Sequence, residues 1–163
     1  MRWAMIRKED ISNGPGIRTS IYVQGCSHHC KGCFNPETWD FNSGNLWTKE
    51  IQNKFIALAN SKTIVGFSIL GGEPLQQGEE MLELVTKIKN TYPDKSIWMW
   101  TGYRYEELNE LQKRIVSKVD VLIDGKFEIE NKNPSLRFRG SSNQRVIDIH
   151  ETILNNKIVL LDI

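Results

Sequence analysis

The chain has 163 residues, of which 39% are hydrophobic and 25% are charged. This length suits a single domain and falls short of the roughly 250 residues of a complete eight-unit (β/α) barrel. Lys and Arg number 21 and Asp and Glu 20, a formal charge of +1, so we expect no nucleic-acid partner. Charges interrupt the N-terminus too early for a signal peptide, and no apolar run is long enough to span a membrane. We therefore expect a soluble, cytoplasmic protein with no membrane partner.

Strands and helices are predicted to alternate along the chain. After a turn at 13–16, β-branched and aromatic residues predict strands at 19–24, 63–70, 95–101 and 119–123. Thr48 is a candidate N-cap for the first helix. Apolar residues recur at helical spacing between the strands, at Ile51, Phe55, Leu58 and Ala59, at Met81, Leu84, Val85 and Ile88, and at Leu108, Leu111 and Ile115. Two short strands are predicted at 144–149 and 157–161. The alternation predicts parallel βαβ units in one α/β domain.

All three cysteines of the chain lie within eight residues, as Cys26, Cys30 and Cys33 in the spacing C-x3-C-x2-C. The odd count argues against a disulfide framework, and thiolates this close can bind one metal centre. A structural zinc ion would need one of the three histidines as a fourth ligand. A thioredoxin-like redox pair of Cys30 and Cys33 would leave Cys26 without a role. A four-iron cluster with three cysteine ligands would keep one iron open for an exogenous molecule, as catalytic sites do, and we favour it.

Polar or glycine-rich segments follow each of the four predicted central strands, at 26–33, 71–74, 101–102 and 124–126. The carboxyl ends of parallel strands meet at one edge of a sheet, where α/β folds bind ligands. We therefore expect these segments to surround one site. In Gly71-Gly72-Glu73-Pro74, two glycines allow close backbone approach to a ligand and Glu73 offers an acceptor for an ammonium group. Taken alone, this segment is more typical of a plain strand-to-helix turn, and it is the preceding three-cysteine loop that favours a ligand site.

The cysteine motif followed by Gly71-Gly72-Glu73-Pro74 resembles the radical S-adenosylmethionine (SAM) superfamily. More closely, segments 13–18, 35–39, 98–103, 121–127 and 139–144 resemble the glycyl-radical activases of anaerobic ribonucleoside-triphosphate reductases. The resemblance extends to about residue 148, and the family pattern places no role on 149–163. It implies a single radical SAM domain over 1–163, folded as an incomplete parallel (β/α) barrel.

The resemblance also implies the cofactors. Cys26, Cys30 and Cys33 would hold a [4Fe-4S] cluster whose open iron binds the amino and carboxylate groups of SAM. One electron would then cleave SAM to methionine and a 5′-deoxyadenosyl radical, which takes a hydrogen atom from a glycine of a partner protein. No side chain is expected to be catalytic itself, because the cluster and SAM carry the chemistry.

The residues expected to contact SAM are Gly32, Cys33, Phe34, Gly71, Gly72 and Glu73, and those expected to close the pocket are Trp100, Thr101 and Asp124. Many superfamily members have an aromatic residue before the third cysteine, where this chain has Gly32. The adenine contact is therefore expected from Phe34 or from the backbone near Gly32. Core packing for Trp100 and turn chemistry for Asp124 are the alternatives. The basic residues Lys126, Arg137, Arg139 and Arg145 are expected either to hold a carboxylate or dock a partner, or to form a solvated face.

The implied partners are the large subunit of an anaerobic ribonucleoside-triphosphate reductase and an external one-electron donor such as flavodoxin, since no cysteine remains for a second cluster. An open side of the barrel would admit the glycine loop of the reductase. Two alternatives stay open: another radical SAM enzyme, similar to pyruvate formate-lyase activase or a deazapurine synthase, and a zinc-binding interaction module.

Overall fold

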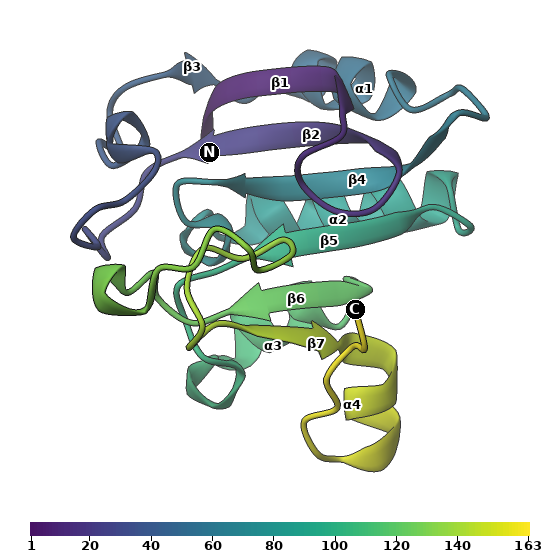
Figure 1. Ribbon diagram of the computed structural model, residues 1–163. Helices are drawn as coiled ribbons and strands as arrows, with labels where there is room; N and C mark the ends of the chain where they lie inside the picture. The colour runs from purple at the N-terminus through teal and green to yellow at the C-terminus, as the bar shows by residue number, and fades with distance from the viewer.

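The computed structural model describes residues 1–163 as a seven-stranded sheet with helices packed against it (Figure 1). The strands are β1 (Arg2–Asp10), β2 (Ile17–Gln24), β3 (Asn45–Leu46), β4 (Ile64–Gly71), β5 (Ser96–Trp100), β6 (Val121–Asp124) and β7 (Arg145–Asp148). The α-helices are α1 (Lys49–Ala57), α2 (Glu79–Thr91), α3 (Glu110–Val116) and α4 (Ile149–Asn155). The strand order is β3-β1-β2-β4-β5-β6-β7, so the sheet is open, with β3 and β7 at its edges.

The four central strands are those that the sequence predicts, each within two residues at either end. β2, β4, β5 and β6 pair in parallel, which confirms the βαβ units. The predicted N-cap is also confirmed, since Thr48 Oγ1 accepts a hydrogen bond from the Ile51 backbone N–H at 3.1 Å. Asn109 and Gln112 form a capping box that starts α3 at Glu110, so Leu108 precedes the helix but is still buried in the core.

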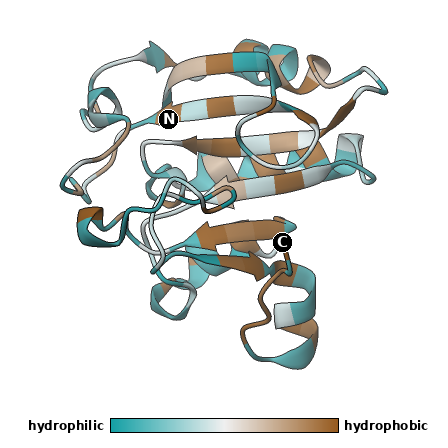
Figure 2. Cartoon of the chain, in the orientation of Figure 1, coloured by the Kyte–Doolittle hydropathy of each residue, from teal (hydrophilic) through white to brown (hydrophobic).

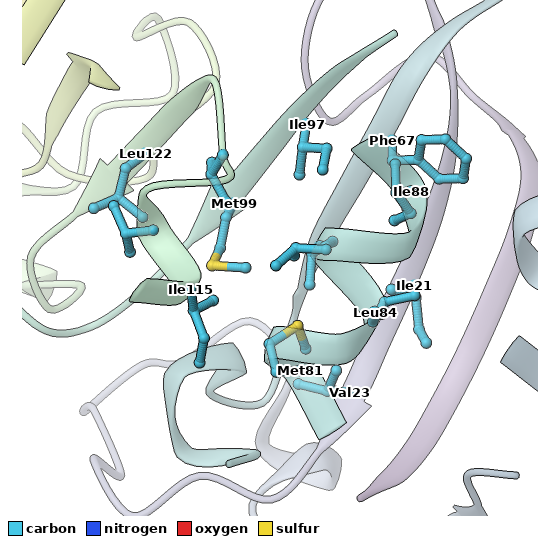
Figure 3. Packing of buried hydrophobic residues seen from close by; sticks show 14 of the residues in the cluster. Ile21, Val23, Phe67, Met81, Leu84, Ile88, Ile97, Met99, Ile115 and Leu122 are labelled. Carbon is cyan, nitrogen blue, oxygen red and sulfur yellow. The ribbon is translucent and has the colours of Figure 1, made fainter. Parts of the chain in front are cut away.

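The main hydrophobic core lies between the sheet and helices α1, α2 and α3, which cover the same face (Figures 1 and 3). Ile21 and Val23 of β2 point toward α2, whose Leu84 is fully buried. Figure 2 shows the hydrophobic residues concentrated along the strands, most fully in β6, whereas much of the outer helical surface is hydrophilic. The other face of the sheet carries loops, polar side chains and a smaller hydrophobic cluster of Trp98, Val121, Ile123 and Val146.

Arg18 occupies this second face and is fully buried. Its guanidinium donates to Ser68 Oγ at 2.9 Å, to the carbonyl of Ser96 at 2.9 Å and to the carbonyl of Pro15 at 3.2 Å. Burial lowers the pKa of Arg18 to about 10, although the nearby charges of Asp120 and Asp10 oppose this shift. The guanidinium therefore stays charged at neutral pH. The side chain thereby fastens the turn before β2 to the centre of the sheet.

The strand predicted at 144–149 is confirmed as β7, but β1, β3 and the segment after β7 differ from the sequence-based prediction. β1 and β3 at one side and β7 at the other pair antiparallel, and the first two were not predicted. Two register shifts in β1 break its alternation of apolar and polar residues, which removes the usual strand pattern. The strand predicted at 157–161 is wrong: only an isolated bridge joins Ile147 and Leu160. The segment before it is the helix α4, capped by Asp148, whose carboxylate accepts from the Glu151 backbone N–H.

The α/β class is confirmed by this architecture. No helix combines the length and the apolar character needed to cross a lipid bilayer.

Candidate active site

A cavity of about 530 Å³ opens at the carboxyl ends of the central strands. Each of the four segments that the sequence predicts at this edge contributes to its wall, which confirms that they surround one site. They contribute His28, Cys30 and Cys33, then Gly71, Gly72 and Glu73, then Thr101 and Gly102, and finally Gly125. Trp100 at the end of β5 also lines the cavity, whereas Cys26 does not. Loops over the second face of the sheet supply further lining residues, among them Asn13, Lys132 and Phe138.

The three cysteines lie in the loop between β2 and the short helical turn Pro36–Thr38. All three are free thiols and partly buried. Burial raises the pKa of Cys26 and of Cys30, although nearby backbone N–H groups partly oppose it. Because a metal binds the thiolate, loading a cluster here releases protons.

The base of the cysteine loop is held by backbone hydrogen bonds. Gly25 N–H donates to Thr38 O at 2.7 Å, and Cys26 N–H donates to Trp39 O at 3.1 Å. Gly25 has a φ of +112° and an added Cβ would lie 2.3 Å from the Phe41 ring, so only glycine fits there. The chain thus leaves β2 through a fixed turn that sets where the loop begins.

The histidines do not join the cysteines. His28 bonds Glu73, His29 stacks on Trp39 with ring centroids 4.5 Å apart, and His150 bonds Asp120. No three His, Cys, Asp or Glu side chains are grouped to hold a single metal ion. In an iron–sulfur cluster each thiolate binds a different iron, so the ligands need not meet at one point. The all-thiolate donor set therefore fits a cluster better than a Cys3His zinc site.

The Gly71-Gly72-Glu73-Pro74 turn follows β4 and packs against the end of the neighbouring strand β2. Gly71 has a φ of +104°, and a Cβ there would lie 2.6 Å from Tyr22 Cα. Gly72 N–H donates to Val23 O at 2.8 Å, and a Cβ on Gly72 would lie 2.5 Å from Gly25 O. The carbonyl oxygen of Gly72 accepts no hydrogen bond within the chain. Both glycines are needed for this approach, and one backbone acceptor stays free at the cavity.

The carboxylate of Glu73 is almost fully buried, with 1% of the residue exposed. One oxygen accepts from the Leu75 backbone N–H at 2.9 Å and from Thr101 Oγ1 at 2.7 Å. The other accepts from the Gly102 backbone N–H and from His28 Nε2, each at 2.8 Å. Glu73 therefore joins three rim segments, and its acceptor sites are already engaged by the chain itself.

Phe34 and Gly32 lie at different places relative to the cavity. Phe34 lines its edge, is 60% exposed and packs against Phe127 with ring centroids 4.9 Å apart. Gly32 is exposed and does not line the cavity; a Cβ there would lie 2.7 Å from Ile129. Of these two expected contacts, only Phe34 borders the cavity directly.

Asp124 and the basic residues near it are not gathered at the cavity. Asp124 is fully buried and points away, accepting from Arg145 and from the Tyr105 backbone N–H. Hydrogen bonds to Asp124 and Glu106 raise the pKa of Arg145. Of the predicted basic group, only Arg139 lines the cavity. The turn-chemistry alternative for Asp124 is thus the one that the structure favours.

Sequence reasoning missed the contacts that hold the middle of the cysteine loop. Gln76 Oε1 accepts from the Ser27 backbone N–H at 2.9 Å, and Gln76 Nε2 donates to Tyr103 OH at 2.9 Å. His28 Nε2, in the middle of the same loop, is hydrogen-bonded to Glu73. Each of these hydrogen bonds joins two residues that are 27 to 49 positions apart in the chain. No local signal could have revealed them.

Comparison with known proteins agrees with this site. Residues 12–147 match the family model described as a 4Fe-4S single cluster domain. A relative from Salmonella typhi is 47% identical over 150 residues, covering 90% of this chain and 97% of the relative. A relative from Escherichia coli K12 is 47% identical over 84% of this chain and 92% of its own length. One from enterobacteria phage T4 is 39% identical over 90% and 93%.

All three relatives are named anaerobic ribonucleoside-triphosphate reductase-activating protein. The likeness covers the cysteine loop, the four central strands and the whole rim of the cavity. The chain therefore belongs to the family of anaerobic ribonucleoside-triphosphate reductase-activating proteins.

Proposed function

We propose that this protein is a radical SAM activase that generates a glycyl radical on an anaerobic ribonucleoside-triphosphate reductase. The observation that carries the proposal is the meeting of the three-cysteine loop with the Gly71–Glu73 turn at one cavity. The relatives' names give the class of partner. The partner is the reductase's large subunit, and an external one-electron donor such as flavodoxin supplies the electron.

Cys26, Cys30 and Cys33 hold the [4Fe-4S] cluster in this proposal. The loop offers three thiols, while His28 is hydrogen-bonded to Glu73 and His29 is stacked on Trp39, which leaves one iron for SAM. The bound cluster and SAM together supply the one-electron chemistry that takes a hydrogen atom from a glycine of the reductase. The chain's own task is to place these groups and to keep water and side reactions away from them.

SAM binds in the cavity beside this loop. A volume of about 530 Å³ lies within the range of roughly 300–1,000 Å³ typical of small-molecule sites. The free carbonyl of Gly72 accepts from the ammonium group, and Gly71 keeps the backbone close enough for that contact. Glu73 acts on the ammonium through its charge, because its oxygens are engaged by four donors of the chain. Cys33 and Phe34, which line the cavity, lie on the nucleoside side, whereas Gly32 lies beside them outside the cavity wall.

The sheet is the incomplete (β/α) barrel of the radical SAM type. Four parallel strands with helices on their outer face, and a ligand cavity at their carboxyl ends, support this assignment. The sheet is open, with β3 and β7 at its edges, and an incomplete barrel of this kind leaves a side through which the cavity can be reached. That access suits a macromolecular substrate whose glycine loop must enter.

The test is anaerobic reconstitution with iron, sulfide, SAM and a reductant, with and without purified reductase. We expect 5′-deoxyadenosine to form and a glycyl-radical doublet to appear in the electron paramagnetic resonance spectrum only when the reductase is present. Bound zinc with neither iron nor sulfide would refute the proposal. Cleavage of SAM with no radical on the reductase would instead indicate a different substrate within the superfamily.

A further inference from the structure

We propose that His28 is a positioning residue, which fastens the middle of the cysteine loop to Glu73 and so sets the place of the cluster relative to bound SAM. The proposal rests on the proposed function for the identity of the two groups. It concerns a side chain that is not a cluster ligand and that borders the cavity next to Glu73.

The hydrogen bond between His28 and Glu73 is shielded from water. The two side chains are 8% and 1% exposed, and the Nε2 and Oε2 atoms are 2.8 Å apart. A carboxylate can only accept, so Nε2–H is the donor. His28 lies two positions after Cys26 and two before Cys30, and this bond therefore acts at the centre of the ligand loop.

The imidazole fits a slot formed at the end of β5. Gly102 forms one wall, where an added Cβ would lie 2.6 Å from His28 Cδ2. Tyr103 forms another, edge-on to the imidazole with ring centroids 4.8 Å apart. The absence of a side chain at Gly102 is what gives the ring room to reach Glu73.

Without His28, one Glu73 oxygen would keep only the Gly102 backbone N–H as a partner. The loop would keep a second tie at Ser27, through Gln76, but that bond lies on the exposed side. Second-sphere bonds of this kind orient metal ligands, and their loss typically costs 10- to 100-fold in affinity or activity. The loop would still offer three thiols, although at less defined positions.

His29 provides a matched control within the same loop. It is exposed, stacks on Trp39 and makes no side-chain hydrogen bond. Its φ of +50° makes asparagine a suitable substitution, because asparagine tolerates this conformation better than most residues that carry a side chain. His29→Asn changes an adjacent histidine of the loop without touching Glu73.

The experiment compares His28→Asn, His28→Gln and His29→Asn in the full chain after anaerobic reconstitution. A Gln amide extends about as far as Nε2 and can reach Glu73, whereas an Asn amide ends near the position of Nδ1 and cannot. Iron and sulfide content, SAM affinity by equilibrium binding, and the change in the cluster's electron paramagnetic resonance spectrum on adding SAM are measured for each. A fourth variant, Gly102→Ala, displaces the ring and keeps the backbone donor to Glu73.

We expect His28→Asn and Gly102→Ala to load iron but to bind SAM about tenfold more weakly and to show a diminished spectral response to it. His28→Gln should recover most of both properties, and His29→Asn should match the parent protein. If His28→Asn binds SAM and responds to it as the parent does, the inference is wrong. If His28→Asn does not fold, Gly102→Ala provides the test, and SAM binding and a spectral response equal to those of the parent in that variant overturn the inference. A parent protein that neither forms a cluster nor binds SAM would refute the proposed function instead.

Discussion

The indole Nε1–H of Trp100 donates to the carbonyl oxygen of Phe138 at 2.7 Å. Trp100 ends β5, and Phe138 lies in the long loop between β6 and β7. Phe138 has a φ of +62°, a conformation that costs a non-glycine residue about 1–2 kcal/mol. Both residues line the cavity, so this bond holds a strained loop in place over the active-site face.

Trp100→Phe should loosen that loop. Losing the hydrogen bond leaves a carbonyl unpaired and should lower the free energy of unfolding by about 1–2 kcal/mol. Trypsin should cut the native protein faster at Lys132, Arg137 or Arg139, which belong to the same loop. Trp39→Phe is the control, because the buried Trp39 indole N–H has no partner to lose. Equal cleavage of both variants would contradict the role of the bond.

Gly71→Ala should destabilise the protein far more than Gly78→Ala does. Both glycines have a positive φ, of +104° and +74°. A Cβ at Gly71 would meet the Tyr22 backbone at 2.6 Å, whereas nothing lies within 4 Å of one at Gly78. We expect losses of about 3 kcal/mol for Gly71→Ala and about 1 kcal/mol for Gly78→Ala in urea denaturation. Similar losses in both variants would mean that the close approach at Gly71 can relax.

Cys30→Ala should abolish the cluster, because the chain has only three cysteines and no replacement ligand. The reconstituted variant should lack iron and sulfide and form no 5′-deoxyadenosine, while its circular dichroism matches the parent. Lys31→Ala, an exposed change at the next position, should keep both properties. A Cys30→Ala variant with full iron content and activity would refute three-cysteine ligation.

Asp120 should make stability depend on acid pH. Burial alone would raise the pKa of Asp120, but hydrogen bonds from Lys89, the Ile97 backbone N–H and His150 outweigh it and hold the pKa below its ordinary value of 3.8. Because the folded pKa is the lower one, the stabilisation is present above the unfolded value and disappears as the pH falls through the folded pKa.

Asp120→Asn should therefore lose about 1–3 kcal/mol near neutral pH and show a shallower decline of stability in acid. Asp94→Asn is the control, since Asp94 is exposed and makes no hydrogen bond or ion pair. Denaturation curves between neutral and strongly acidic pH provide the measurement. Parallel pH profiles for Asp120→Asn and the parent would contradict the assignment.

Local pattern was sufficient for the central strands, the first three helices and the N-cap at Thr48. Each of these elements depends on neighbouring residues in the chain, such as the apolar spacing of α2 or the hydroxyl that caps α1. β1 escaped prediction because its two register shifts interrupt the strand period. α4 carried one local signal that was missed, the pair Asp148 and Glu151 at its start.

The sequence by itself determined the spacing of the three cysteines, the glycine turn and their common edge of the sheet, because motif spacing and the direction of parallel strands are properties of the chain order. Only the tertiary structure decided which side chains form hydrogen bonds at that edge. It turned the Glu73 carboxylate toward His28, Thr101 and Gly102, and it turned Asp124 away from the cavity toward Arg145. The physical reason is that a buried polar group must find partners, and those partners come from whichever distant segments the fold brings within hydrogen-bonding distance.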